Sequence, residues 1–278
     1  MNIHDIVARA LTEDLGAGDV TTQALFPDAV SAVGTIIAEE RDGLVAAGLA
    51  VAVEVFRQVD PSLACSPNVE DGDRIPYGTT VLTVTGDGRS ILKGERVALN
   101  FLQRLSGIAT LTAKFCAAVK GTRARILDTR KTTPGLREFE KWAVVLGGGY
   151  NHRHSLADGV LIKDNHLALT GGDVARACRL ARERAPHGLK IEVEVRTLEQ
   201  AQAAVDGGAD ILLLDNMDVP TIRKAIESIK GRALVEVSGG VSLATVREIA
   251  AAGPDFISVG ALTHSAPAAD LSMDIVPR

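Results

Sequence analysis

Cationic side chains gather in one part of the sequence, between Asp128 and His166. From Arg123 to Arg153 the chain has seven Lys or Arg residues against three Asp or Glu, although its formal net charge is −5. Cations at this density are unsuited to a packed core, and they exceed what a solvated face needs. They also alternate with small and turn-forming residues. We therefore predict a binding site for a polyanion in this part of the chain.

The types of cation indicate which anions the site would bind. Arg130, His152 and Arg153 carry planar or switchable donors, which suit paired carboxylates. Lys131 and Lys163 are point charges, which suit a pyrophosphate group. These residue types therefore suit carboxylate and pyrophosphate groups.

Two acids are expected beside these cations. Glu194 and Asp215 end neighbouring apolar runs and would face the same pocket. Such a pair suits the hydroxyls of a ribose, a Mg²⁺ ion or an oxocarbenium-like centre, or it could simply balance Lys131 and Lys163. Glu192 lies on the same face of its strand as Glu194, so the pattern leaves open which of the two is active.

The elements that must position these groups follow a repeating pattern. We expect strands at 124–128, 158–163, 190–195, 210–215, 233–238 and 255–259, separated by helices near 136–146, 172–185, 197–206, 218–230 and 242–252. This alternation predicts a parallel, barrel-like β/α domain, in which working residues lie at the C-terminal ends of the strands.

Every expected strand ends on a reactive or anion-binding group. In chain order these are Asp128 with Arg130 and Lys131, then Lys163, Glu194, Asp215, Ser238-Gly239-Gly240 and Ser258-Val259-Gly260. Solvated strand-end charges would explain one or two of the six ends, but not all of them together.

The last two strand ends predict a site for a terminal phosphate. Ser238-Gly239-Gly240 and Ser258-Val259-Gly260 run into helices that we expect near Ser242 and Pro267. Gly permits close backbone approach, and N–H groups at a helix start bind phosphate. A single Ser-Gly-Gly is usually only a turn, but two such loops on successive strands favour phosphate binding.

A smaller domain is expected before the barrel. Helical apolar patterns at 3–15, where Gly16 ends the helix, and at 44–58 are followed by strand-like runs such as Thr80–Val84, with turn signals at 71–73 and 86–88. These features predict a mixed α/β domain. A long amphipathic helix from about 93 to 120 would then join the two domains.

Composition excludes several other classes of protein. The 278-residue chain is 46% hydrophobic, which is enough for a full core, and its acidic net charge gives no general attraction to nucleic acid or to an anionic membrane. The longest apolar stretch, Gly43–Phe56, is too short to span a bilayer and contains Glu54. The N-terminus lacks the pattern of an export signal. We expect a soluble, cytoplasmic protein.

The cysteines and histidines do not predict a zinc site. Cys65, Cys116 and Cys178 are far apart and form no C-x-x-C pair, so neither a disulfide framework nor structural zinc is indicated. His152 and His154 form an H-x-H pair, which ligates metal in some barrels, but no zinc-like set of ligands accompanies it.

The motifs resemble those of the quinolinate phosphoribosyltransferase family, also called nicotinate-nucleotide pyrophosphorylases (carboxylating). The resemblance runs over essentially the whole chain and is carried by DTRKTTPGLR from Asp128, GGGYNHR from Gly147 and LIKDNH from Leu161. It implies an incomplete, seven-stranded α/β barrel with an N-terminal open-faced α/β domain, whereas the pattern alone gives six clear strands. We expect the N-terminal domain at 1–108, with the C-terminal tail 268–278 packed on it, and the barrel at 109–267.

The resemblance also implies an activity. The reaction joins quinolinate to 5-phosphoribosyl 1-pyrophosphate in the presence of Mg²⁺ and gives nicotinate mononucleotide, pyrophosphate and CO₂, a step of NAD biosynthesis. The family's Glu-Val-Glu and Leu-Leu-Asp-Asn motifs favour Glu194 and Asp215 as catalytic acids and as ligands of Mg²⁺, beside the catalytic Lys131 and Lys163. The substrate-binding residues would be Arg104, Thr129, Arg130, Lys131, His152, Arg153, Lys163, Glu194, Asp215, Ser238, Gly239, Gly240, Ser258, Val259 and Gly260.

Arg104 is the residue whose role depends most on the resemblance. From the sequence alone it would be an exposed charge on the long helix. In the family the matching Arg reaches the active site of the neighbouring subunit, which implies a homodimer with shared active sites, or a hexamer built from such dimers.

Three other activities stay open at this point. A paralogous phosphoribosyltransferase would act on another acceptor such as nicotinate. A Schiff-base aldolase would use Lys163, and a sugar-phosphate sensor would bind the phosphoribosyl donor without releasing pyrophosphate.

Overall fold

The computed structural model describes residues 2–278 and divides the chain into two compact units, each of which is described by itself. The first unit runs to Ala113 and also contains Thr133–Gly148 and Ser265–Arg278. The second unit consists of Lys114–Thr132 and Gly149–His264. The C-terminal tail thus belongs to the N-terminal unit, and so does segment 133–148, which we had expected in the barrel.

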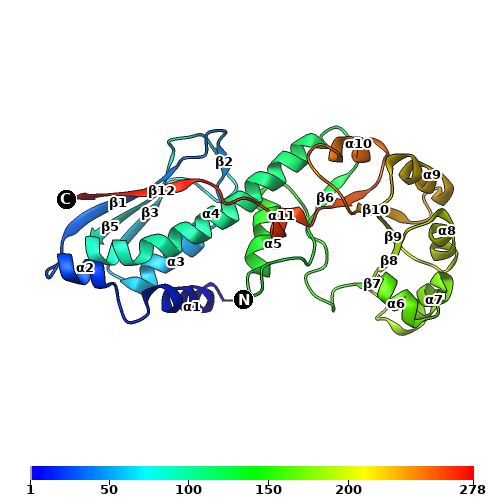
Figure 1. Cartoon of the computed structure of the whole chain (residues 1–278), viewed down its shortest axis with the longest axis horizontal. Helices are drawn as coiled ribbons and strands as arrows, with labels where there is room; N and C mark the ends of the chain where they lie inside the picture. Colours follow the sequence, from blue (N-terminus) through cyan, green and yellow to red (C-terminus); the bar gives the residue numbers. More distant parts are fainter. Residues whose placement is uncertain (1) are drawn as a thin grey trace. The chain divides into compact units, whose positions relative to one another are not determined.

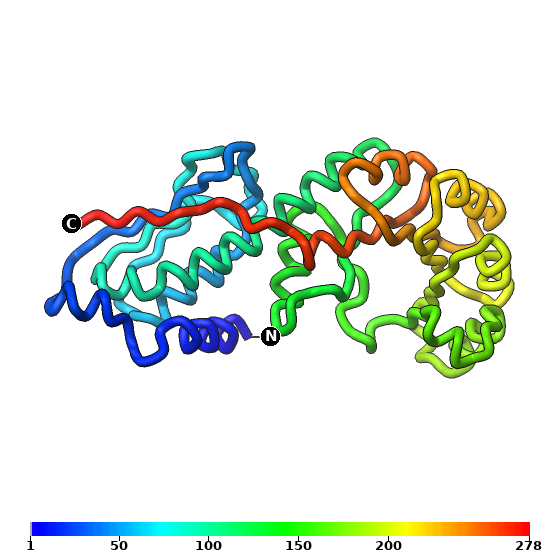
Figure 2. Tube along the Cα trace, viewed as in Figure 1, coloured from blue at the N-terminus to red at the C-terminus, as the bar shows by residue number. Residues whose placement is uncertain are grey.

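The first unit is built on an antiparallel sheet whose strands come from both ends of the chain. Its order is β12-β1-β5-β3, and the register pairs Val33 with Val276 and with Thr85. Figures 1 and 2 show β12, in red, running beside β1, in blue. The strands are β1 (Ser31–Ala38), β3 (Ala64–Pro67), β5 (Thr80–Asp87) and β12 (Leu271–Pro277).

Helices and a two-stranded ribbon complete this unit. The helices are α1 (Ile3–Leu15), α2 (Val20–Leu25), α3 (Leu49–Val59), α4 (Gly88–Ala118), whose last turn enters the second unit, and α5 (Arg137–Leu146), and the ribbon consists of β2 (Leu44–Val45) and β4 (Arg74–Ile75). Phe56 of α3 and Ile91 of α4 are fully buried, as is Ile36 of β1. The apolar stripes of α3 and α4 therefore form the core of this unit with the sheet.

Some sequence expectations for this unit were wrong in detail. The helix expected at 44–58 begins only at Leu49, because Leu44 and Val45 pair with β4 and Gly48 has a φ of 105°, which a helix does not allow. The long helix begins at Gly88, before the expected start. The helix at 3–15 is confirmed.

The second unit contains a parallel sheet with the order β6-β11-β10-β9-β8-β7. Helices α7, α8, α9 and α10 lie on the outside of this sheet (Figure 1). The strands are β6 (Arg125–Leu127), β7 (Val160–Ile162), β8 (Ile191–Val195), β9 (Ile211–Asp215), β10 (Leu234–Ser238) and β11 (Phe256–Ser258). The helices are α6 (Asp164–Leu169), α7 (Val174–Arg184), α8 (Leu198–Asp206), α9 (Val219–Ile229), α10 (Val246–Ala251) and α11 (Ala261–His264).

The sheet is an incomplete barrel, as expected. Within residues 2–278 it has six strands, and a single parallel bridge between Leu127 and Tyr150 adds a seventh position beside β6. The bridge is made by the Tyr150 N–H donating to Ile126 O at 2.9 Å and the Asp128 N–H donating to Tyr150 O at 3.1 Å. This short seventh position holds the residues after Tyr150 next to the end of β6.

The expected strands and helices of the barrel are confirmed to within a few residues, except near the C-terminal end. The helix expected from 242 begins at Val246, and α11 begins directly after Gly260, where we had expected a helix near Pro267. Helix α6 was not anticipated, because a six-residue helix directly after a strand gives too few apolar positions to show a period.

Alternation along the parallel strands places the polar groups on one face. Val193, Val195 and Val237 are buried and alternate with the polar residues of β8 and β10, whereas β9 is apolar up to Asp215 at its end. Because successive side chains of a strand point to opposite faces, the polar side chains gather on the other face. They are Glu192, Glu194, Asp215, Glu236, Ser238 and Ser258.

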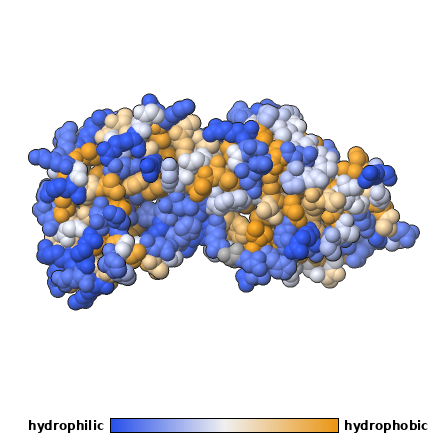
Figure 3. Space-filling view, turned by 180° about the vertical axis from the view of Figure 1, so that it is seen from behind, coloured by the Kyte–Doolittle hydropathy of each residue, from blue (hydrophilic) through white to orange (hydrophobic). Residues whose placement is uncertain are grey.

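The surface in Figure 3 is mostly hydrophilic, with hydrophobic residues between the polar ones. Among the residues that the structure describes, none of the helices combines the length and the apolar character that a membrane crossing requires.

Candidate active site

A cavity of about 290 Å³ lies at the C-terminal ends of the parallel strands and is entirely within the second unit. It brings together all four residues that the sequence predicted to be catalytic and most of the predicted substrate-binding residues. The lining residues are Thr129, Arg130, Lys131, His152, Arg153, Leu161, Lys163, Glu194, Leu213, Asp215, Glu236, Ser238 and Ser258. Gly239, Gly240, Val259 and Gly260 adjoin two of them in sequence, and Arg104 belongs to the first unit.

The loop after β6 is held by its own hydrogen bonds. The Lys131 N–H donates to Thr129 Oγ1 at 3.0 Å, and Thr263 Oγ1 donates to Lys131 O at 2.8 Å. Thr129 therefore holds the backbone of this loop, and the side chain of Lys131 is exposed. The Nε of Arg130 is buried and has no hydrogen-bond partner among the described residues, as expected of a donor that waits for an anion.

Lys163 follows β7 directly. Its backbone N–H donates to His166 Nδ1 at 2.9 Å, which fixes the start of α6. Its side chain is exposed, so the charge of Lys163 stands at the rim of the cavity.

The two acids predicted from the sequence, Glu194 and Asp215, contact the same arginine. Glu194 Oε1 lies 3.3 Å and Asp215 Oδ2 lies 3.2 Å from the same guanidinium nitrogen of Arg196. Burial raises the pKa of Glu194, with further contributions from Asp215 and Asp164, and Arg196 acts in the opposite direction. Two carboxylates this close together, in a partly buried place, offer the oxygen ligands that Mg²⁺ prefers.

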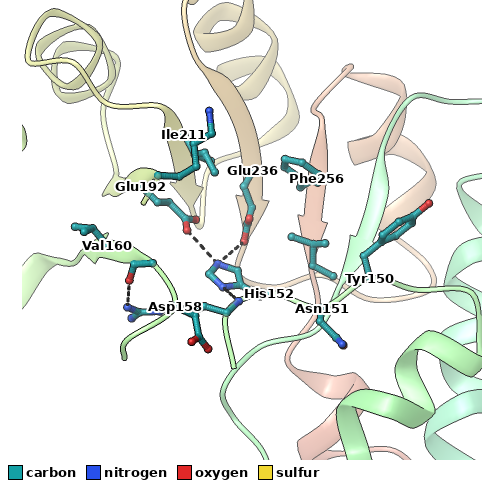
Figure 4. Close-up of a pocket in the computed structure, with 13 residues that line it drawn as sticks. Tyr150, Asn151, His152, Asp158, Val160, Glu192, Ile211, Glu236 and Phe256 are labelled. Carbon is teal, nitrogen blue, oxygen red and sulfur yellow. Dashed lines mark hydrogen bonds and ion pairs between the residues drawn. The ribbon is translucent and has the colours of Figure 1, made fainter. Parts of the chain in front are cut away.

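His152 is held through its backbone and through both nitrogens of its ring. Its backbone N–H donates to the fully buried Asp128 at 2.8 Å, and the N–H of Arg153 donates to His152 Nδ1 at 2.7 Å. Because Nδ1 accepts, the ring proton lies on Nε2, which faces Glu192 Oε2 at 3.1 Å (Figure 4). The imidazole expected to bind a substrate carboxylate is thus already engaged with an acid of the protein.

Glu236 was missed by the sequence reasoning, and Glu192 was considered only as an alternative to Glu194. Glu236 is 2% exposed, and its Oε1 lies 3.7 Å from His152 Nε2. Burial and the charge of Glu192 raise the pKa of Glu236, whereas His152 acts to lower it. The signal that could have found both acids is their position, two residues before Glu194 and Ser238 on the inward face of their strands.

A second cavity of about 290 Å³ shares His152, Arg153 and Glu236 with the first. It is lined by residues at the starts of strands, such as Ile211 and Phe256 (Figure 4). Its cations are Lys190 and Arg153. The Lys and acid residues at the strand ends converge in the first cavity and not in the second.

His152, Glu192 and Glu236 lie close enough together to suggest a metal site. The hydrogen bond from the Arg153 N–H argues against one, because a ligating Nε2 would have to lose the proton that this tautomer places there. In this cluster the imidazole of His152 therefore pairs with two buried acids, Glu192 at 3.1 Å and Glu236 at 3.7 Å.

The loops after β10 and β11, which the sequence predicts to bind phosphate, differ in the groups that they offer. Gly239 and Gly240 have φ values of 91° and 63°, a conformation that Gly adopts easily. The Val259 N–H donates to Leu127 O at 2.9 Å and is therefore already used. Ser258 Oγ is buried and interacts with the carboxylate of Glu236, whose pKa it acts to lower, and it is the polar side chain that the second loop adds to the cavity.

Arg104 lies on α4 in the first unit. Its Nη2 and Nε donate to Glu140 Oε1 at 2.7 Å and 3.1 Å, and its Nη1 donates to Ala266 O at 3.2 Å. Glu140 is fully buried and also accepts from the N–H and Oγ1 of Thr133. Within one chain Arg104 is thus held beside Thr133, close in sequence to Arg130 and Lys131.

An α/β barrel that presents cations and a carboxylate pair at its C-terminal strand ends, together with a mixed α/β domain, defines an enzyme for anionic, phosphorylated substrates. The chain belongs to the quinolinate phosphoribosyl transferase family: residues 19–106 match the model of its N-terminal domain and residues 108–274 that of its C-terminal domain.

Relatives from bacteria and plants agree with this family over nearly their whole length. The chain is 41% identical to the probable nicotinate-nucleotide pyrophosphorylase [carboxylating] of Bacillus subtilis, over 95% of this chain and 90% of the relative. It is 43% identical to the chloroplastic nicotinate-nucleotide pyrophosphorylase [carboxylating] of Arabidopsis thaliana, over 97% of this chain and 82% of the relative. The crystal structure of NadC from Streptococcus pyogenes superposes with a TM-score of 0.93 at 43% identity, covering 99% of this chain and 97% of the other.

Proposed function

We propose that this chain transfers the phosphoribosyl group of 5-phosphoribosyl 1-pyrophosphate to quinolinate, with release of pyrophosphate and CO₂. The observation that carries the proposal is the convergence of Lys131, Lys163, Glu194 and Asp215 in one cavity at the strand ends. Family membership and the relatives' names support the same reaction.

The phosphoribosyl donor fits the strand-end groups. The backbone at Gly239 and Gly240 and the hydroxyl of Ser258 would hold the terminal phosphate, and Lys131 and Lys163 would neutralise the departing pyrophosphate. Glu194 and Asp215 would bind the ribose hydroxyls and face the positive charge that develops at the anomeric carbon as its C–O bond breaks. A Mg²⁺ ion at this pair would supply charge stabilisation to the pyrophosphate oxygens.

Quinolinate fits the arginines. Arg130, with its buried unpaired Nε, and Arg153 would bind the two ring carboxylates and aim the ring nitrogen at the anomeric carbon. Once the ring nitrogen is alkylated, its positive charge stabilises the electron pair that stays on the adjacent ring carbon when the carbon–carboxylate bond breaks. CO₂ leaves, and this carbon takes up a proton from solvent. Catalysis then consists mostly of positioning and electrostatics.

We also propose a homodimer in which Arg104 enters the neighbouring subunit's active site. This part rests on the family resemblance, and it requires Arg104 to exchange its contact with Glu140 for a substrate carboxylate. We propose a cytoplasmic location as well, which is supported by the three cysteines, none of which forms a disulfide among the described residues.

The choice of acceptor provides the test. Pyrophosphate and CO₂ should appear in equal amounts with quinolinate. Nicotinate should be a poor substrate, with kcat/KM lower by roughly 30-fold or more, because cations meant for the second carboxylate stay unpaired. Comparable kcat/KM for the two acceptors would favour the paralogous activity on nicotinate, and donor binding without pyrophosphate release would favour a sensor.

A further inference from the structure

Arg196 is a cation that the proposed reaction does not use, and it lies on the carboxylates that the reaction needs. It follows the last residue of β8, and its side chain is 55% exposed. Its Nη2 lies 3.1 Å from Asp164 Oδ2, 3.3 Å from Glu194 Oε1 and 3.2 Å from Asp215 Oδ2. Its Nε also donates to Asp215 Oδ2 at 3.2 Å.

These contacts join three successive strand ends. Asp164 begins α6 after β7, Glu194 belongs to β8, and Asp215 ends β9. The Arg196 backbone is tied down as well, because its N–H donates to Gln200 Oε1 at 2.7 Å in the first turn of α8. The guanidinium is therefore held over the acid pair from a fixed backbone position.

The acids need a counter-charge in this place. Glu194 and Asp215 are mostly buried, with side chains 13% and 15% exposed, and Asp164 adds a third negative charge nearby. Like charges at this separation repel, so a cation must balance them when the site holds no metal. Arg196 contacts Glu194 Oε1 and Asp215 Oδ2, which are the oxygens that a divalent cation at this pair would need.

We propose that Arg196 sets the metal affinity of the acid pair: its guanidinium is the resident counter-ion of Glu194 and Asp215, and a divalent cation binds only as Arg196 leaves their oxygens. Asp164 does not line the cavity and is 52% exposed, so it remains as a partner for Arg196 after the exchange. The enzyme would thereby bind free Mg²⁺ weakly and exchange one counter-cation for another during each cycle. This inference rests on the proposed metal role of Glu194 and Asp215.

The test is a titration of the whole protein with Mn²⁺, followed by the electron paramagnetic resonance signal of the free ion. Arg196→Gln removes the positive charge and should bind Mn²⁺ about tenfold more tightly than the unaltered protein, with the difference shrinking as salt is added. The matched control is Arg232→Gln. Arg232 is similarly exposed, at 45%, and pairs with Asp206 on the outside of the same unit. The control loses the same charge but should leave Mn²⁺ affinity unchanged.

A double variant, Glu194→Gln with Arg196→Gln, tests whether the ion binds at the acid pair. The tightened binding should disappear in the double variant if the ion is at the acid pair. The unaltered protein and Arg196→Gln are compared for Mn²⁺ affinity. If the unaltered protein binds Mn²⁺ in a way that requires Glu194, but Arg196→Gln binds it equally or more weakly, the proposed role of Arg196 is wrong and the metal role of the acid pair stands. If Glu194 contributes to Mn²⁺ binding neither in the unaltered protein nor in Arg196→Gln, the acid pair does not bind the metal, and the proposed role of Arg196 is wrong as well.

Discussion

At the scale of single residues, we expect the largest loss of turnover from replacing Lys131 or Lys163. Both are exposed at the ends of strands and line the cavity, and each would stand opposite the negative charge that grows on the departing pyrophosphate. Lys131→Ala and Lys163→Ala should each lower kcat by about 100-fold or more, since a preorganised charge is removed from the transition state. Pyrophosphate release at saturating substrates measures this effect. Lys224→Ala, an exposed lysine of α9, serves as the control.

A folded Lys131→Ala or Lys163→Ala variant that keeps nearly full turnover would remove that lysine from the catalytic set. A rise in KM without a change in kcat would instead mean that the lysine binds ground state and transition state equally.

Glu236 predicts how stability depends on pH. Its pKa is raised from 4.5 to about 8, chiefly by burial and then by Glu192. Between these two values the unfolded chain loses the proton that the folded protein keeps. The contribution of Glu236 to stability is therefore present below pH 4.5 and is lost as the pH rises through this window.

Glu236→Gln keeps the shape of the neutral acid but cannot ionise, so its stability does not fall with rising pH for this reason. The Tm of the variant relative to the unaltered protein should therefore increase from pH 5 to pH 8, as followed by circular dichroism. Glu227→Gln, an exposed acid on α9, should show no such trend. A constant difference in Tm across this range would mean that Glu236 is ionised in the folded protein.

At the scale of elements, the loop after β10 offers a matched pair of substitutions. Gly239 and Gly240 both have a positive φ, but a Cβ on Gly239 would come within 3.0 Å of the backbone N of Asn216 and would overlap its side chain, whereas a Cβ on Gly240 meets nothing within 4 Å. Gly240→Ala should cost about 1 kcal/mol of stability for the left-handed conformation. Gly239→Ala should cost more and should raise the KM for the phosphoribosyl donor, because the loop must move away from Asn216.

Denaturant unfolding and initial rates compare these two variants. Equal KM values for Gly239→Ala and the unaltered protein, in a folded variant, would place the phosphate of the donor away from this loop.

The elements also show what the sequence can and cannot predict. The barrel strands were predictable because buried valines such as Val193 and Val237 alternate with polar residues, and because the other strands are short apolar runs. The pairing of β1 with β12 was not, because it joins residues about 240 positions apart and local periodicity carries no information on such a partner. Glu236 was missed for a related reason: a Glu inside an apolar run marks an inward position, but only the structure shows that His152 lies opposite it.

At the scale of the whole molecule, the proposed dimer rests on Arg104, which in a single chain contacts Glu140. Because Glu140 is fully buried, Arg104→Ala would leave its carboxylate short of a partner and would destabilise the fold by about 3–5 kcal/mol. Arg104→Lys keeps a cation for Glu140 but loses the forked donor that binds a substrate carboxylate. It is therefore the better variant for testing whether Arg104 acts across a subunit interface.

Mixing two inactive variants distinguishes the possibilities. In a dimer of one Arg104→Lys subunit and one Lys131→Ala subunit, the first keeps its Lys131 and receives Arg104 from its partner, so one site is complete and the other carries both defects. Random exchange makes half of the dimers mixed, and half of their sites are intact, so about a quarter of the full activity should return. The measurement is pyrophosphate release from the unsorted co-expressed population, with two affinity tags to confirm that mixed dimers form; mixed dimers isolated through both tags should show about half of the full activity. Mixed dimers without recovered activity would mean that Arg104 serves its own subunit, where its contact with Glu140 would hold the segment that carries Thr133 next to Arg130 and Lys131.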